Sequence, residues 1–234
     1  MSADAHDRAA VDFDEFADDY EQALNQGISL SGEDRDFFAR GRVEWLQRCT
    51  RGNRPERVLD YGCGTGAASP LFRTVLGASS VVGVDTSAEA IAIAQRTATV
   101  GMTFSCIDDY RPAGNVDIAY CNGVFHHIPP ADRASALRYI RDSLKHGGVF
   151  SFWENNPWNP GTRLVMSRIP FDRDAILVSA FEARRLLRAE GFEILSTHFQ
   201  FVFPKILSAL RPLEVPLARL PLGAQYQVLC RKPS

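Results

Sequence analysis

Short apolar segments that alternate with stretches of helical periodicity constrain the fold of this chain more than any other feature. Five such segments occur, at residues 57–60, 80–85, 102–108, 116–121 and 148–153. Stretches with helical spacing lie between several of them, at about 67–76, 88–99 and 131–145. Near-continuous apolar strands are typical of a parallel sheet that helices cover on both faces. With right-handed crossovers, the pattern predicts a doubly wound α/β fold.

The first 50 residues predict two helices. Phe13, Phe16 and Tyr20 recur at steps of three and four residues, which places them on one face of a helix that ends near residues 25–27. A second helix is predicted over about 33–49.

The C-terminal third predicts a loop, a helix and two strands. Prolines and glycines make residues 154–178 a loop with at most one short helix, and a helix is expected over 180–190. Residues 192–203, with Phe199, Phe201 and Phe203 on one face, and residues 225–231 predict the strands. Because no proper crossover helix separates these strands, we expect an antiparallel pair at one edge of the sheet.

Composition excludes several classes of protein. The chain has 234 residues, 45% of them hydrophobic, which is enough for a sizeable core and too much for a disordered chain. A net charge of -2 argues against general binding to nucleic acid. No uninterrupted apolar run reaches 18 residues and the acidic start lacks an apolar signal core, so we expect a cytoplasmic protein without a transmembrane helix. Five scattered cysteines without a CxxC motif predict neither a metal site nor a disulfide framework.

The glycine-rich turn after the first apolar segment is the most informative motif. It reads VLDYGCGTG over residues 58–66, so a strand ends in an acid and glycines follow before a helix. Ala67 also completes a dinucleotide-type G-x-G-x-x-A pattern. The acid favours a cationic or amino-bearing ligand, because a diphosphate gains nothing from a carboxylate at this turn. Asp85 and Asp108, at the ends of the next two strands, could accept hydrogen bonds from ribose hydroxyls and an adenine amine.

The motif and its successors VVGVDTSAEAI, FSCIDDY and IAYCNGVFHHIP together resemble class I S-adenosylmethionine-dependent methyltransferases. The resemblance is closest to the small-molecule branch related to quinone biosynthesis and covers roughly residues 10–153. It implies a Rossmann-like seven-stranded sheet, mostly parallel with an antiparallel C-terminal strand. It also implies a helical cap at 1–50 and an S-adenosylmethionine-binding domain at 51–234, together forming a single domain.

The same resemblance implies a set of cofactor-binding residues. The methionine moiety is expected to contact Asp60, Gly62, Gly64, Gly66 and the backbone of Asn122, and Cys63 between the glycines is also expected to bind the cofactor. The ribose is expected at Asp85, the adenine at Thr86 and the adenine amine at Asp108 with Asp109, while Tyr20 would close over the cofactor. Alternative interpretations stay open: Asp60 could cap a helix, Asp85 could be a solvated strand end, either of Asp108 and Asp109 could be a turn residue, and Tyr20 could be an ordinary core residue.

Three residues are candidates for the chemistry. His126 and His127 follow the fourth predicted strand, where an imidazole could take a proton near neutral pH, although the family's histidine here is mostly structural. Glu154 ends the fifth strand and could act as a base or orient an acceptor hydroxyl. The indoles of Trp153 and Trp158, with nearby amides, could line a pocket for a ring or polyol, or the segment could be a surface loop.

Residues 204–222 form a leucine-rich insertion with basic residues between the last two strands. It could dock a lipid-like substrate, contact a membrane surface, form a dimer contact, or pack on its own sheet edge.

The sequence therefore predicts a methyltransferase that uses S-adenosylmethionine on a small-molecule acceptor, with oxygen favoured as the methylated atom and no nucleic acid as partner. Two alternatives stay open: a methyltransferase-like module that binds the cofactor without turnover, and a nicotinamide-dependent oxidoreductase.

Overall fold

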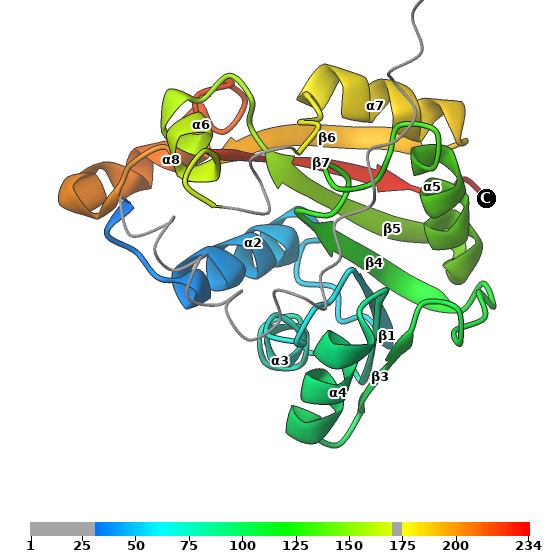
Figure 1. The fold of residues 1–234 in the computed structure, drawn as a ribbon. Helices are drawn as coiled ribbons and strands as arrows, with labels where there is room; N and C mark the ends of the chain where they lie inside the picture. The colour runs from blue at the N-terminus through cyan, green and yellow to red at the C-terminus, as the bar shows by residue number, and fades with distance from the viewer. Residues whose placement is uncertain (1–30, 170–174) are drawn as a thin grey trace, which may run out of the picture.

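A seven-stranded sheet with the order β3-β2-β1-β4-β5-β7-β6 runs through the protein (Figure 1). The computed structural model describes residues 31–169 and 175–234. The strands are β1 (Arg57–Tyr61), β2 (Ser80–Asp85), β3 (Met102–Cys106), β4 (Val116–Asn122), β5 (Leu144–Asn155), β6 (Glu193–Gln200) and β7 (Gln225–Arg231). Neighbouring strands run parallel from β3 to β5, whereas β7 is antiparallel to both β5 and β6. The predicted α/β architecture with an antiparallel C-terminal strand is confirmed.

Helices cover both faces of this sheet. They are α2 (Arg35–Cys49), α3 (Ser69–Thr74), α4 (Ala88–Thr97), α5 (Arg133–Ser143), α6 (Pro160–Met166), α7 (Ala180–Ala189), the 3-10 helix η4 (Lys205–Leu213) and α8 (Glu214–Leu217). Successive strand residues point to opposite faces. Val58 therefore packs into a core with α2, α3 and α4, while Leu59 packs into a second core with α5 and α7. Both cores are apolar, which is why the strands read as continuous apolar runs.

The register of the parallel strands aligns their carboxyl ends. Tyr61 at the end of β1 pairs with Val84 on one side and Cys121 on the other, and Asp85 pairs with Cys106. The strand order reverses between β1 and β4. In open parallel sheets, ligands bind in the crevice at the carboxyl end of such a reversal.

The structure corrects three boundaries. The helix predicted over 131–145 ends at Ser143, and β5 begins at Leu144 rather than at 148, because the turn after α5 pairs with β4 before the main ladder. The third strand ends at Cys106, not at 108. The strand predicted over 192–203 ends at Gln200, because Phe201 adopts a positive φ of 64°.

That positive φ also makes the predicted phenylalanine face wrong. Phe199 packs against Tyr226 in the core beneath α7, whereas Phe201 packs against Phe37 and Phe38 of α2 on the other face of the sheet. A turn of the backbone therefore sends two side chains that are two positions apart to opposite faces.

Of the two helices predicted in the first 50 residues, only the second lies within the residues that the structure describes. The helix predicted over 33–49 corresponds to α2, whose N-terminus is capped by Asp34 accepting a hydrogen bond from the amide of Phe37 (2.8 Å). Tyr20 and the helix around it lie outside the described residues, and the boundary at residue 50 stays a prediction. Among the described residues, no helix combines the length and apolarity needed to cross a membrane.

Candidate functional site

A cavity of about 1350 Å³ lies at the carboxyl ends of β1, β2 and β4. Its walls come from α2, from the glycine-rich turn after β1, from the loop after β4, from α6 and from residues 201–204. Pockets for a single drug-sized ligand typically measure about 300–1,000 Å³. The cavity is therefore large enough for a nucleoside cofactor and a second small molecule.

The glycine-rich turn forms the floor of the cavity. Gly64 has a φ of 52°, and a Cβ built on it would meet no atom within 4 Å. Gly66, at φ 78°, has no such open space, because a Cβ there would lie 2.9 Å from the Phe104 ring. Gly64 thus leaves room for a ligand to approach the backbone, while Gly66 allows the turn to pack on β3 and α4 and does not line the cavity.

Asp85 at the end of β2 is held by backbone amides. Its carboxylate accepts hydrogen bonds from the amide of Gly64 (2.7 Å) and the amide of Ser87 (3.0 Å), one on each oxygen. A carboxylate oxygen has capacity for a second hydrogen bond. Asp85 and its neighbour Thr86 line the cavity, so the carboxylate is positioned to accept from two hydroxyls of a ligand.

Asp60 is a buried carboxyl in β1. It is 3% exposed and accepts a hydrogen bond from the Ser69 hydroxyl (2.9 Å). Burial raises its pKa from 3.8 to about 7 and the negative charge of Asp85 adds to this, while the Ser69 bond and the charge of Arg42 oppose it. A cation in the cavity would favour the ionised form of Asp60.

The structure separates the two adjacent acids that follow β3. Asp108 lines the cavity and Asp109 does not. The amide of Asp109 donates to the carbonyl of Cys106 (3.0 Å), which makes this residue part of the turn that follows the strand. Asp108 is thus the acid that can meet a ligand.

Cys63 and Asn122 complete this part of the wall. The Cys63 thiol contacts the carbonyl of Gly64 (3.6 Å), and burial raises the pKa of the thiol, so it stays protonated. The side-chain oxygen of Asn122 is buried, lines the cavity at the end of β4 and has no hydrogen-bond partner among the described residues. Buried acceptors are normally paired, so this oxygen is a candidate ligand contact.

His126 and Glu154 form a buried pair. The Nδ1 atom of His126 lies 2.6 Å from the Glu154 carboxylate, which also accepts hydrogen bonds from the amides of Phe125 (2.8 Å) and His126 (3.3 Å). An ionised carboxylate only accepts, so this hydrogen bond to the Glu154 carboxylate requires the proton of a neutral His126 ring on Nδ1, with the lone pair on Nε2. His126 lines the cavity, and Glu154 lies behind it at 1% exposure, outside the cavity lining.

Arg133 fixes the loop that carries His126. Its guanidinium, on α5, is almost fully buried and donates to the carbonyls of Phe125 (3.1 Å), Ile128 (3.0 Å) and Ile176 (2.9 Å). His127, whose ring lies 4.0 Å from that of His126, also lines the cavity.

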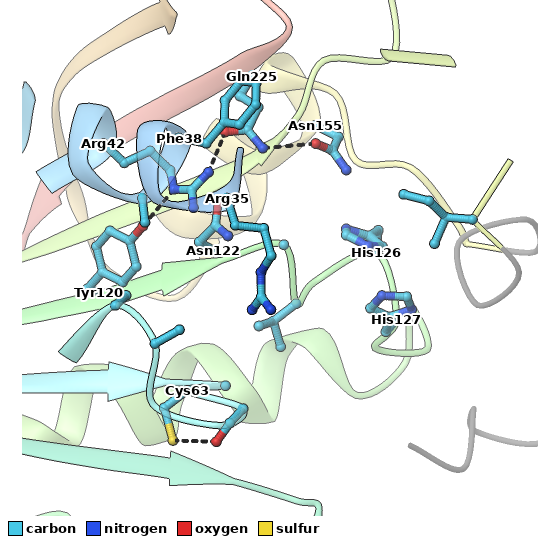
Figure 2. Close-up of a pocket in the computed structure, with 18 of the residues that line it drawn as sticks. Arg35, Phe38, Arg42, Cys63, Tyr120, Asn122, His126, His127, Asn155 and Gln225 are labelled. Carbon is cyan, nitrogen blue, oxygen red and sulfur yellow. Dashed lines mark hydrogen bonds between the residues drawn. The ribbon is translucent and has the colours of Figure 1, made fainter. Parts of the chain in front are cut away.

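A polar network on the α2 side of the cavity was not predicted from the sequence. Arg42 donates to the Tyr120 hydroxyl (3.0 Å) and to the side chain of Gln225 (2.9 Å), which in turn donates to Asn155 (3.2 Å) (Figure 2). Arg42 is only 9% exposed. A charged residue at an inward position of an otherwise apolar helix face was the signal that could have revealed it.

A second arginine lies on the same helix. Arg35 precedes Arg42 by seven positions, or two helical turns, and also lines the cavity. One helix therefore directs two guanidinium groups toward the ligand space.

The predicted indole pocket is wrong. Trp153 is fully buried and donates to the Ser151 hydroxyl (2.9 Å), and Trp158 is 58% exposed, so neither ring lines the cavity. The amide of Asn156 is bound to the carbonyls of Pro221 (3.1 Å) and Gly223 (2.8 Å), which ties the loop to the segment before β7.

Comparison with known proteins identifies the class. Residues 58–148 match the family model described as a methyltransferase domain. The chain is 26% identical over 140 residues to a trans-aconitate 2-methyltransferase of Rhodopseudomonas palustris (strain BisB5), covering 58% of this chain and 54% of that protein. It is 30% identical over 128 residues to a ubiquinone biosynthesis O-methyltransferase of Bordetella avium (strain 197N), covering 50% of each. The chain thus spans about half the length of the curated relatives it matches.

The fold agrees with this match. A crystal structure of an S-adenosylmethionine-dependent methyltransferase from Mesorhizobium loti superposes with a TM-score of 0.58 at 22% identity, covering 81% of this chain and 97% of that one. Residues 58–148 thus match a methyltransferase domain, and the family match, the relatives and the fold together support a class I S-adenosylmethionine-dependent methyltransferase with S-adenosylmethionine as the cofactor class. The residues present fit that cofactor, because Gly64 leaves the floor open and the carboxyls of Asp60 and Asp85 face a ligand with a ribose and a positive charge.

Replacing Gly64 by Ala tests the floor of the cavity. The added methyl group would occupy ligand space, so we expect the affinity for S-adenosylhomocysteine, measured by calorimetry, to fall at least tenfold. Gly52→Ala is the matched control, since Gly52 also has a positive φ (71°) and open space but lies outside the cavity. Both variants should lose about 1–2 kcal/mol of stability from backbone strain. Equal affinities in the two variants would place the ligand elsewhere.

The raised pKa of Asp60 predicts a pH-dependent stability. Between pH 3.8 and about 7 the folded protein holds a proton on this carboxyl that the unfolded chain has lost. The stabilisation is therefore fully present below pH 3.8 and is lost as the pH rises to about 7, by on the order of 2–4 kcal/mol. Urea unfolding at several pH values should show that Asp60→Asn lacks this decline relative to the wild type. If the unfolding free energies of the two proteins changed with pH in parallel, the buried carboxyl of Asp60 would not be the origin of the decline.

Proposed function

We propose that this protein transfers a methyl group from S-adenosylmethionine to a hydroxyl oxygen of a small-molecule acceptor. The observation that carries the proposal is the His126–Glu154 pair at the wall of a cavity whose floor carries carboxyls at successive strand ends. The cofactor, when bound, supplies an electrophilic methyl group on a positively charged sulfur. The protein then has to hold both molecules in line, exclude water and remove one proton.

The acids and amides of the cavity are assigned to the cofactor. Asp85 accepts from the ribose hydroxyls beside Thr86, and Asp108 from the adenine amine. Asp60 and the unpaired Asn122 oxygen serve the positively charged methionine end. Gly64 allows the cofactor to approach the turn closely, Cys63 beside it contributes to the wall, and Arg42 is assigned to a carboxylate of the bound molecules. The expected contribution of Tyr20 as a covering residue stays a prediction.

His126 is assigned as the general base. With the Nδ1 proton held by Glu154, the Nε2 lone pair can accept the proton of an acceptor hydroxyl, and the buried carboxylate then stabilises the imidazolium. Glu154 acts through His126 as a positioning residue and does not touch the acceptor. His127 is assigned to acceptor contact on the same wall. This division of roles differs from the expectation that Glu154 itself could act as the base.

The base also bears on the class of acceptor. A hydroxyl needs a proton acceptor during methyl transfer, whereas a carboxylate does not. The name of one relative, a ubiquinone biosynthesis O-methyltransferase, favours oxygen as the methylated atom. The pair in this chain supports a hydroxyl over a carboxylate.

The alternatives make different predictions. A nicotinamide-dependent oxidoreductase has to accommodate a diphosphate, which the carboxyls of Asp60 and Asp85 would repel. A binding module without turnover would have no use for a base held by a buried carboxylate. Formation of S-adenosylhomocysteine with a panel of phenolic, enolic and carboxylic acceptors separates the proposed activity from both.

Glu154→Gln tests the assignment of the pair. The glutamine cannot stabilise the imidazolium or enforce the Nδ1 proton, so we expect kcat to fall roughly 10²-fold with the affinity for S-adenosylhomocysteine unchanged. The acidic limb of the pH profile of kcat should also be lost.

The double variant is the matched control. Because His126 and Glu154 act as a unit, His126→Asn combined with Glu154→Gln should be no slower than His126→Asn alone. Normal turnover in Glu154→Gln would remove the base from the mechanism and favour a carboxylate acceptor.

A further inference from the structure

The 3-10 helix η4 turns its apolar side to solvent. Side chains three residues apart lie on one side of such a helix, which places Leu210 and Leu213 together, and Leu207 precedes them at a kink of the backbone; all three are at least 41% exposed. Ile206 beside them is 90% exposed, and no residue of η4 is buried. An apolar stripe on a surface helix normally faces the core, so this orientation is inverted.

Polar contacts hold the helix in this orientation. Arg211, which points to a different side of η4 from Leu210, forms an ion pair with Glu33 (2.6 Å) and lies over the ring of Phe37 (4.4 Å to the centroid). The Glu214 carboxylate, directly after η4, accepts hydrogen bonds from three successive amides at residues 201–203 (3.2, 3.1 and 3.0 Å). The charged side is thereby used for internal contacts, and the leucines are left outside.

Further exposed apolar side chains lie in the segments around α6 and after η4. We call the whole set the apolar rim: Trp158, Leu164, Ile206, Leu207, Leu210, Leu213, Val215, Leu220 and Leu222. The side chain of Asn159, at the start of α6, donates to the carbonyl of Leu222 (2.8 Å) and joins the two parts. Leu164 and Pro204 also line the cavity. Figure 1 shows α6 and α8 at the same end of the molecule.

The rim segments carry more positive than negative charge. Residues 156–169 and 204–222 contain the exposed cations Arg163, Arg168, Lys205 and Arg219. Their acidic residue, Glu214, is occupied by the three amides. Apolar side chains combined with cations are the composition that binds an anionic lipid surface.

We propose that the apolar rim binds this protein to an anionic membrane surface, with the opening of the cavity toward the lipid. A second copy is a poorer occupant, because two identical cationic surfaces would repel each other. The proposed membrane contact does not depend on the proposed methyl transfer. Only one consequence rests on that function: an apolar acceptor could pass from the bilayer into the cavity.

Vesicle flotation with the full chain tests the proposal. We expect binding to phosphatidylcholine vesicles that contain phosphatidylglycerol, and at least tenfold weaker binding to phosphatidylcholine alone. Ile206→Glu combined with Leu210→Glu should lower binding to the anionic vesicles at least tenfold, because carboxylates replace the inserting side chains. Lys205→Glu combined with Arg219→Glu should weaken it as well, since it reverses the charge and leaves the apolar stripe intact.

Val100→Glu is the matched control. Val100 is 91% exposed, like Ile206, but it precedes β3 at the opposite edge of the sheet from β6. We expect this variant to float like the wild type, and all variants to keep their affinity for S-adenosylhomocysteine, which separates failure of lipid binding from failure of the methyltransferase proposal. Absence of binding to anionic vesicles would overturn the proposal. Equal loss in Val100→Glu, or self-association in sedimentation velocity that disappears in the Ile206/Leu210 variant, would overturn it too.

Discussion

The placement of carboxyl groups at the carboxyl ends of neighbouring parallel strands is the constraint on which the site depends. Asp85 is fixed by the amides of Gly64 and Ser87, so the same turn that opens the floor of the cavity also orients the acid beside it. Its charge contributes to the raised pKa of Asp60, whose burial is the main cause. Two carboxyls in a half-enclosed site favour a ligand that brings positive charge and hydroxyl donors, and they disfavour a second anion.

The opposite wall supplies different chemistry. Glu154 is too deep to meet an acceptor, but it controls which nitrogen of His126 carries the proton. Arg133 anchors the loop around this histidine through three carbonyls. The buried pair and its anchoring cation form one supported unit, in which the residue at the surface of the cavity is held in place by residues behind it.

Much of the fold follows from the sequence because each strand is a continuous apolar run that ends at a polar residue. The acids Asp60 and Asp85 are predictable for the same reason, since strand ends meet at one edge of the sheet. The choice between Asp108 and Asp109 is not, because it depends on the turn after Cys106. Arg42 joins Tyr120 and Gln225, which lie far away in the sequence, so no local pattern reveals its contacts. At Phe201, where the backbone changes direction, the amide donates to the carboxylate of Glu214, and this contact is likewise distant in the sequence.

The most direct test of the carboxyl site is a calorimetric titration of the wild type and of Asp85→Ala with S-adenosylhomocysteine and, separately, with NAD. The account predicts that the wild type binds the nucleoside thioether and not the dinucleotide. It also predicts that Asp85→Ala weakens binding by roughly 1–3 kcal/mol, through loss of a charged acceptor for two hydroxyls. Unchanged affinity in the variant, or a preference of the wild type for NAD, would contradict it.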